Sequence, residues 1–282
     1  MKHVVMFSGG VGSWAAAKRV AAEHGTSNLT LLFTDTLMED ADLYRFLYQA
    51  AVDVFSGDPV PNLVCLADGR DPWQVFGDVG FLGNSRVDPC SRLLKREIAD
   101  RWLKENCAPE ETVIYLGLDW TEEHRFDDGL GRGAKARYAR NGWVCKAPMC
   151  DPPFFSKPEL FRALESRTGI PLPRLYKLGF PHNNCGGFCI KAGISHFSHL
   201  LRTLPARFAY HEEKEQEIRA LLGKDVSILR EMVNGELRRL TLRDLRLRVE
   251  AKAQIDMFDW GGCGCFVDEE DRAQTEEGTS HV

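Results

Sequence analysis

The sequence predicts an α/β fold, with a doubly wound parallel sheet followed by a mainly helical C-terminal part. Through residues 1–150, short apolar segments alternate with helical segments, and a turn rich in glycine and serine follows the first apolar segment. Beyond residue 150, apolar residues recur mainly with helical spacing. Parallel strands need crossover connections, which are usually helices, so the first pattern is typical of an α/β domain.

The elements of the first part follow from its apolar runs and its helix-forming residues. In chain order we expect a strand over 4–7, a helix over 14–23, a strand over 28–36, a helix over 40–55, a strand over 63–66, a helix over 90–106 and a strand over 112–119. The apolar strands are typical of a sheet that is buried on both faces.

A proline-rich stretch over 147–153 predicts a change of organisation near residue 150. Helices are expected afterwards over 156–168, 194–204, 206–222 and 237–253. We therefore divide the chain into a nucleotide-binding α/β domain over 1–150, a helical cysteine-rich region over 151–266 and a disordered acidic tail over 267–282.

The composition is that of a globular protein, with 282 residues, 44% of them hydrophobic and 27% charged. No apolar run approaches the ~20 residues that cross a bilayer, and the N-terminus has no signal-peptide pattern. We expect a cytoplasmic protein without membrane contact. Its net charge of -5 gives no general reason to expect a nucleic-acid partner, and a homo-oligomer stays open.

The glycine-rich turn predicts a site for an anionic phosphate. Glycines let the backbone come close to a ligand, and the N-terminus of the following helix presents free N–H groups and a positive dipole end. The turn has the pattern SGGxxS and consists of Ser8, Gly9, Gly10, Val11, Gly12 and Ser13. An ordinary strand-to-helix turn is the alternative.

The SGGxxS turn resembles the phosphate loop of the PP-loop (adenine nucleotide alpha-hydrolase) superfamily. About the first 130 residues resemble its phosphoadenosine phosphosulfate (PAPS) reductase-like members by motif, and the cysteine-bearing C-terminal part resembles them more loosely. This resemblance implies a Rossmann-like sheet of the PP-loop, or HUP, type. It also implies binding of ATP or of a sulfonucleotide such as PAPS or APS, with Mg²⁺ as a candidate cofactor. Many ATP-using members carry a charged residue before the last serine, where this chain has Val11-Gly12.

Later segments match the same family in part. Asp35 and Thr36 stand where relatives often have Asp-Thr-Gly, and Gly117 opens a segment similar to their Gly-apolar-x-x-x-Glu-x-x-Arg. By position, the resemblance implies nucleotide contacts from Asp35, Thr36, Gly117 and Arg125, and a polar or catalytic role for Glu122 or Glu123. The alternatives are a helix cap at Asp35 and a solvated charged turn over 120–125.

Residues 90–95 resemble the Cys-x-x-x-Leu-Lys segment of the sulfonucleotide reductases. The match implies a reactive or ligating thiol at Cys90 and a phosphate contact from Lys95. Because Cys90 stands at the start of the expected helix, we expect a lowered thiol pKa. A cysteine with no role at a helix start is the alternative.

Nine cysteines in a cytosolic chain favour metal or redox chemistry over disulfides. Two pairs lie in glycine-rich segments: Cys185 with Cys189, and Cys263 with Cys265. Four thiolates from two loops suit tetrahedral zinc or an iron–sulfur cluster. Redox cysteines and unrelated core cysteines are the alternatives.

Together these features predict an enzyme of adenylyl transfer or of sulfur transfer or reduction, with a cysteine-ligated metal or iron–sulfur centre. Its acceptor is a small molecule or a nucleic acid. The basic stretch over 132–146 is expected to be a solvated face, with a nucleic-acid contact as the alternative. A non-catalytic nucleotide-binding, metal-stabilised module of a larger assembly is the second hypothesis.

Overall fold

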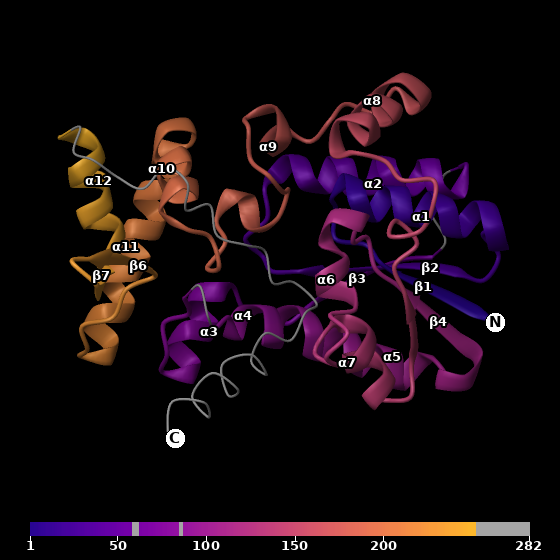
Figure 1. Cartoon of the computed structure of the whole chain (residues 1–282), viewed down its shortest axis with the longest axis horizontal. Coiled ribbons are helices and arrows are strands. Elements are labelled where there is room, and N and C mark those ends of the chain that lie inside the picture. The colour runs from indigo at the N-terminus through magenta and orange to yellow at the C-terminus, as the bar shows by residue number, and fades with distance from the viewer. Residues whose placement is uncertain (58–61, 85–86, 252–282) are drawn as a thin grey trace.

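The computed structural model describes residues 1–57, 62–84 and 87–251, and its centre is a five-stranded parallel sheet (Figure 1). The strands lie in the order β3-β2-β1-β4-β5. Their bounds are β1 Lys2–Met6, β2 Leu29–Asp35, β3 Leu63–Ala67, β4 Thr112–Tyr115 and β5 Val144–Lys146. The predicted α/β class with a parallel sheet is confirmed, because the connections between these strands contain helices.

Helices cover both faces of the sheet (Figure 1). On one face, α1 (Val11–His24) and α2 (Ala41–Phe55) pack in a core with Val5, Phe7 and Phe33. On the other face, α5 (Glu97–Asn106) and α7 (Ala134–Arg140) share a core with alternate residues of the same strands. The three central strands, β2, β1 and β4, are mainly apolar because both of their faces are buried.

The first layer also contains part of the chain beyond residue 150. Helix α8 (Lys157–Thr168) places Leu160 and Leu164 in the core formed by α1 and α2. Helix α9 (Arg174–Lys177) follows it and lies at the N-terminal end of α2 (Figure 1). One hydrophobic core therefore joins residues from β1 to α8.

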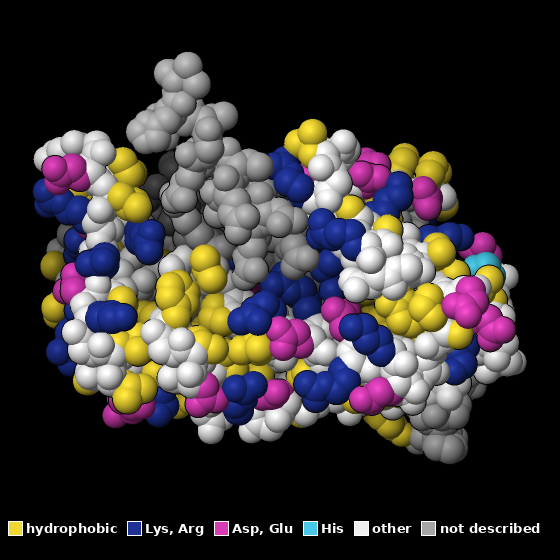
Figure 2. Space-filling model, turned by 90° about the horizontal axis from the view of Figure 1, so that it is seen from below, with side chains coloured by type: hydrophobic (Ala, Val, Ile, Leu, Met, Phe, Trp, Pro, Cys, Tyr) yellow, Lys and Arg dark blue, Asp and Glu magenta, His cyan; other side chains and the backbone are white. Residues whose placement is uncertain are grey.

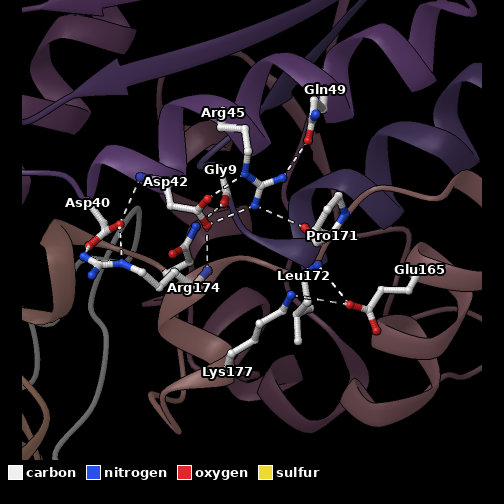
Figure 3. A network of polar contacts seen from close by, with 11 residues as sticks. Gly9, Asp40, Asp42, Arg45, Gln49, Glu165, Pro171, Leu172, Arg174 and Lys177 are labelled. Atoms are coloured by element: carbon white, nitrogen blue, oxygen red, sulfur yellow. Dashed lines mark hydrogen bonds and ion pairs between the residues drawn. The ribbon is translucent and has the colours of Figure 1, made fainter.

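Polar contacts tie α9 to the start of α2 (Figure 3). Asp40 caps α2 by accepting from the Asp42 N–H at 3.0 Å, and it also accepts from Arg174 Nε at 3.3 Å. Asp42 Oδ2 accepts from the Arg174 N–H at 2.7 Å, and Arg45 donates to Pro171 O at 3.2 Å. The Asp40 side chain is 1% exposed, so its carboxylate needs a partner inside the protein. The ion pair with Arg174 supplies this partner and fixes α9 at the start of α2.

A second core lies beside the sheet domain (Figure 1). It contains residues of α3 (Pro72–Val79), α10 (Ile194–Thr203), α11 (Pro205–Leu222), α12 (Leu242–Glu250) and the antiparallel hairpin of β6 (Leu229–Val233) and β7 (Glu236–Leu240). The remaining short helices are α4 Pro89–Ser91, η1 Arg92–Arg96, η2 Pro109–Glu111, η3 Trp120–Glu122, α6 Glu123–Phe126 and η4 Cys185–Gly187.

The prediction of one helix over 237–253 is wrong for its described part. Residues Glu236–Leu240 form β7, and α12 begins only at Leu242. Asn234 and Gly235 join β6 to β7 with φ of 53° and 84°, the backbone of a two-residue hairpin turn. The Thr241 hydroxyl then caps α12 by accepting from the Asp244 N–H at 3.1 Å.

Two further sequence predictions need comment. Strand β5 was not expected, because it has three residues and only its central Cys145 is buried. The tail predicted to be disordered, 267–282, lies outside the described residues. Within the described residues, no helix combines the length and the apolar character that a membrane span requires.

Glu215 joins three elements of the second core. Its Oε1 accepts from the Ile228 N–H at 3.0 Å, and its Oε2 accepts from the Leu242 N–H at 2.7 Å. The residue is fully buried, and this burial raises the pKa of its carboxyl to about 7. One side chain on α11 thus supports the segment before β6 and the first turn of α12.

The folded chain should lose stability through Glu215 as the pH rises. Folding raises the pKa, so its contribution is fully present below the unfolded value near 4.5 and is lost as the pH passes about 7. Between about pH 5 and about pH 8, the wild-type chain should lose up to about 3 kcal/mol of unfolding free energy relative to Glu215→Gln. Urea titrations at each pH measure this, with exposed Glu213→Gln as the control. Parallel curves for wild type and Glu215→Gln would contradict the assignment.

Candidate functional site

The candidate site lies where the sheet reverses its strand order. From β1 the chain proceeds to β2 on one side, whereas β4 pairs with β1 on the other side. The chain therefore leaves β1 and β4 toward opposite sides of the sheet. The carboxyl ends of such a strand pair are the usual ligand position in open parallel sheets. The SGGxxS turn follows β1, and Gly117 follows β4.

The two loops touch backbone to backbone. A Cβ added to Gly12 would lie 2.7 Å from Gly117 O, and a Cβ added to Gly117 would lie 2.6 Å from Ser13 N and Cα. Both distances are shorter than real Cβ contacts, so glycine is required on both sides of this approach. Gly117 is thus a packing partner of the SGGxxS turn.

Helix α1 presents its first turn at this end of the sheet. Gly10 is its N-cap residue, and no side chain of the described residues caps it. Ser13 turns its hydroxyl back to Gly10 O, to which it donates at 2.8 Å. The first N–H groups of a helix have no acceptor within the helix, so Val11, Gly12 and Ser13 have N–H groups for a ligand.

A cavity of about 300 Å³ lies over this turn. Five of the six turn residues line it, together with Gly117 and Arg125. The other lining residues are Met6, Leu116, Leu118, Asp119, Glu122, Lys157, Leu160, Tyr176, Pro181, His182, Asn183 and Asn184. The remaining turn residue, Gly9, accepts a hydrogen bond through its carbonyl oxygen from Asn183 Nδ2 at 2.9 Å.

The far wall of the cavity comes from residues that the sequence did not indicate as a site. Tyr176 places its hydroxyl 3.2 Å from the position of a Cβ on Gly10. The Lys157 ammonium lies 5.4 Å from the Tyr176 ring centroid and donates to Pro181 O. Only the polar run His182-Asn183-Asn184 before Cys185 could have indicated this wall.

The polar turn after β4 contributes an ion pair. Arg125 donates to Glu122, and both side chains line the cavity. Glu123, predicted as catalytic, is exposed and lies outside the cavity lining. Of the two glutamates considered, Glu122 is therefore the one that faces the cavity.

Asp35 and Thr36 lie beside a different group of residues. Asp35 accepts from the Tyr44 hydroxyl at 3.0 Å and from the Leu37 N–H at 2.8 Å. Leu37 has a φ of 56°, in the left-handed region that glycine adopts most easily. Neither Asp35 nor Thr36 lines the cavity, and the cap of α2 comes from Asp40.

Thr36, Glu39, Lys95 and Cys185 form a polar cluster, which we call the thiol cluster. The first three residues are buried, and Cys185 is half-buried. Thr36 donates to Glu39 Oε1 at 3.0 Å, and the Cys185 N–H donates to the same carboxyl group. Lys95 Nζ lies 3.9 Å from Glu39 Oε1 and 4.0 Å from Cys185 Sγ. Burial raises the pKa of Glu39, whereas the Lys95 charge lowers it.

Backbone irregularities accompany this cluster. Lys95 lies in η1, a π-helical turn, and Cys185 has a positive φ of 49°. Both features are uncommon and are found most often at functional sites. The predicted phosphate contact at Lys95 is placed in the thiol cluster, outside the cavity lining.

The expected lowering of the Cys90 pKa is wrong. Burial raises the pKa of this thiol, and the neighbouring Cys185 and Asp88 raise it further. Helix α4 has only three residues before the π-helical turn, so the helix end has little effect against desolvation. Cys90 is thus a protonated thiol beside the thiol cluster, and its catalytic role stays a prediction.

The predicted metal centre is only half within the described residues. Cys185 belongs to the thiol cluster, and Cys189 is buried in the second core. Cys263 and Cys265 lie outside the described residues. The described part of the chain has no group of three or more potential metal-ligating side chains. Two thiols do not complete a zinc or iron–sulfur site, so the four-thiolate centre stays a prediction.

The basic stretch over 132–146 carries partnered charges. Arg132 pairs with Asp128 at 2.9 Å, Lys135 with Asp127 at 2.7 Å, and Arg137 Nη1 with Asp100 at 2.9 Å. Basic and acidic side chains are also interspersed over the face seen in Figure 2. This pairing weakens the case for a phosphate-binding surface on the stretch.

Comparisons with known proteins give no assignment. No protein-family model matches the chain, and a search of curated proteins finds no match.

Gly117→Ala should disturb the SGGxxS turn, because its Cβ would meet the Ser13 backbone at 2.6 Å. We expect it to lower the free energy of unfolding by about 1–3 kcal/mol, the usual cost of overpacking. Gly57→Ala is the control, since its Cβ would meet nothing within 4 Å. Urea unfolding measures both, and equal stability of the two variants would show that the close approach is not real.

Proposed function

We propose that the chain is a PP-loop protein similar to the PAPS reductases and that it binds an adenine nucleotide, either ATP or a sulfonucleotide, at the SGGxxS turn. The uncapped start of α1, facing the cavity at the switch point of the sheet, carries this proposal. The strand order agrees with a Rossmann-like sheet of the PP-loop, or HUP, type.

The chemistry of the cavity favours an anion held by main-chain groups. The turn has no charged side chain of its own, so its N–H groups and the dipole of α1 supply the attraction. Lys157 and Arg125 add positive charge at the walls. Asp119 and Glu122 supply an equal number of carboxyl groups there, so the main-chain N–H groups carry the attraction. Leu116, Leu118 and Leu160 offer apolar surface for a ring, as nucleotide pockets generally do.

The thiol cluster favours sulfur chemistry as the reaction. Asn184 lines the cavity and Cys185 follows it directly, so a thiol lies one residue beyond the proposed nucleotide site. Lys95 Nζ lies 4.0 Å from Cys185 Sγ, so a cation stands beside this thiol. We therefore place adenylyl transfer or sulfur transfer at the nucleotide, with Cys185 and Cys90 as the candidate thiols.

A non-catalytic nucleotide-binding module is the second candidate. The uncharged Val11-Gly12 pair favours it, and so does the engagement of both cavity cations, Arg125 with Glu122 and Lys157 with Pro181 O. Such a protein would bind nucleotide through the same turn without turning it over.

Calorimetry with ATP, APS and PAPS tests nucleotide binding. Ser8→Ala, which removes a hydroxyl from the cavity wall, should weaken binding by about 3–10-fold, the value of one hydrogen bond. Ser27→Ala, on an exposed loop, should leave it unchanged.

Assays of pyrophosphate and sulfite release then separate the two candidates. Release of either product supports the enzyme, and tight binding without release supports the module. Absence of binding to all three nucleotides would falsify the proposal.

A further inference from the structure

Asn183 reaches the phosphate loop from a distant part of the chain. Its side chain is buried, with 1% of the residue exposed, and its Nδ2 donates to Gly9 O at 2.9 Å. The two residues are 174 positions apart. A buried amide with a defined acceptor in the loop is a specific constraint on that loop.

The constrained peptide unit lies between two glycines. In a planar trans peptide, the C=O of one residue and the N–H of the next point in opposite directions. Asn183 binds the Gly9 oxygen, so the Gly10 N–H points away from Asn183. Gly10 lines the cavity and is the N-cap residue of α1.

A Gly-Gly peptide can rotate more easily than any other, because neither residue has a Cβ that resists a change of backbone conformation. A rotated unit would present a carbonyl oxygen where an anion needs a donor, and the two would repel. Gly9 already has a φ of 75°, which a side chain would disfavour. The loop therefore needs a contact from outside to select one orientation.

We propose that Asn183 is a positioning residue for the phosphate loop, holding the Gly9–Gly10 peptide so that the Gly10 N–H serves a bound phosphate. The inference rests on the proposed nucleotide function and adds a residue to it. Two side chains limit the space around this peptide. A Cβ on Gly9 would lie 2.9 Å from Leu43, and a Cβ on Gly10 would lie 3.2 Å from the Tyr176 hydroxyl. Asn183 supplies the hydrogen bond that distinguishes its two orientations.

The test compares ATP with adenosine, because only ATP needs the phosphate loop. Calorimetry on Asn183→Ala should show about 10-fold weaker ATP binding, because one hydrogen bond is lost and the Gly10 N–H is no longer held in place. The affinity for adenosine should change less than about 2-fold. Asn183→Asp keeps the shape, replaces the donor with a negative oxygen and should weaken ATP binding further. Thermal unfolding of each variant shows that it is folded.

Asn141→Ala is the matched control. Its amide also donates to a backbone oxygen, that of Arg137 at 3.2 Å, but within α7 and away from the cavity. ATP binding should not change in this variant. Unchanged ATP affinity in both Asn183 variants overturns the inference and leaves the nucleotide proposal intact. Equal loss of ATP and adenosine binding also overturns it. A wild-type chain that binds none of ATP, APS and PAPS removes both proposals.

Discussion

The backbone contact between the SGGxxS turn and Gly117 is the constraint on which the site depends. Atoms of Gly12, Ser13 and Gly117 lie so close that a methyl group on either glycine has no room. This contact joins the ends of β1 and β4, the neighbouring strands from which the chain leaves in opposite directions. It sets the floor of the cavity. The turn after β4 forms one wall, and residues between Lys157 and Asn184 form the far wall.

Local signals were enough to predict the sheet and the turn. Apolar runs indicated four of the five strands, and glycines placed between a strand and a helix indicated the start of α1. The hairpin at Asn234-Gly235 also has a local signal. The helical period of the leucines holds from Leu242 onward, where α12 begins, and fails for residues 237–240, which belong to β7. Strand β5 has too few residues to show a period.

The far wall of the cavity was beyond prediction because it depends on tertiary contacts. Lys157, Tyr176 and Asn183 have no motif of their own and approach the turn only after α8 packs on α1. At Cys90 a local signal is outweighed by tertiary structure. A helix N-terminus lowers the pKa of a thiol, but burial raises the pKa of Cys90 by more. The sequence predicts functional roles for Asp35, Lys95 and Cys185, but they do not share one site. Asp35 binds the Tyr44 hydroxyl, whereas Lys95 and Cys185 lie in the thiol cluster.

The shared core of α1, α2 and α8 has a consequence for how this chain can be divided. A fragment ending near residue 150 would retain every strand of the large sheet but lose Leu160 and Leu164, leaving an apolar face of α1 in water. It would also lack Tyr176 and Asn183, so the turn would stand open on one side. The parts before and after residue 150 are therefore not interchangeable modules. An exchange of either part between proteins would have to keep residues 157–184 with the sheet.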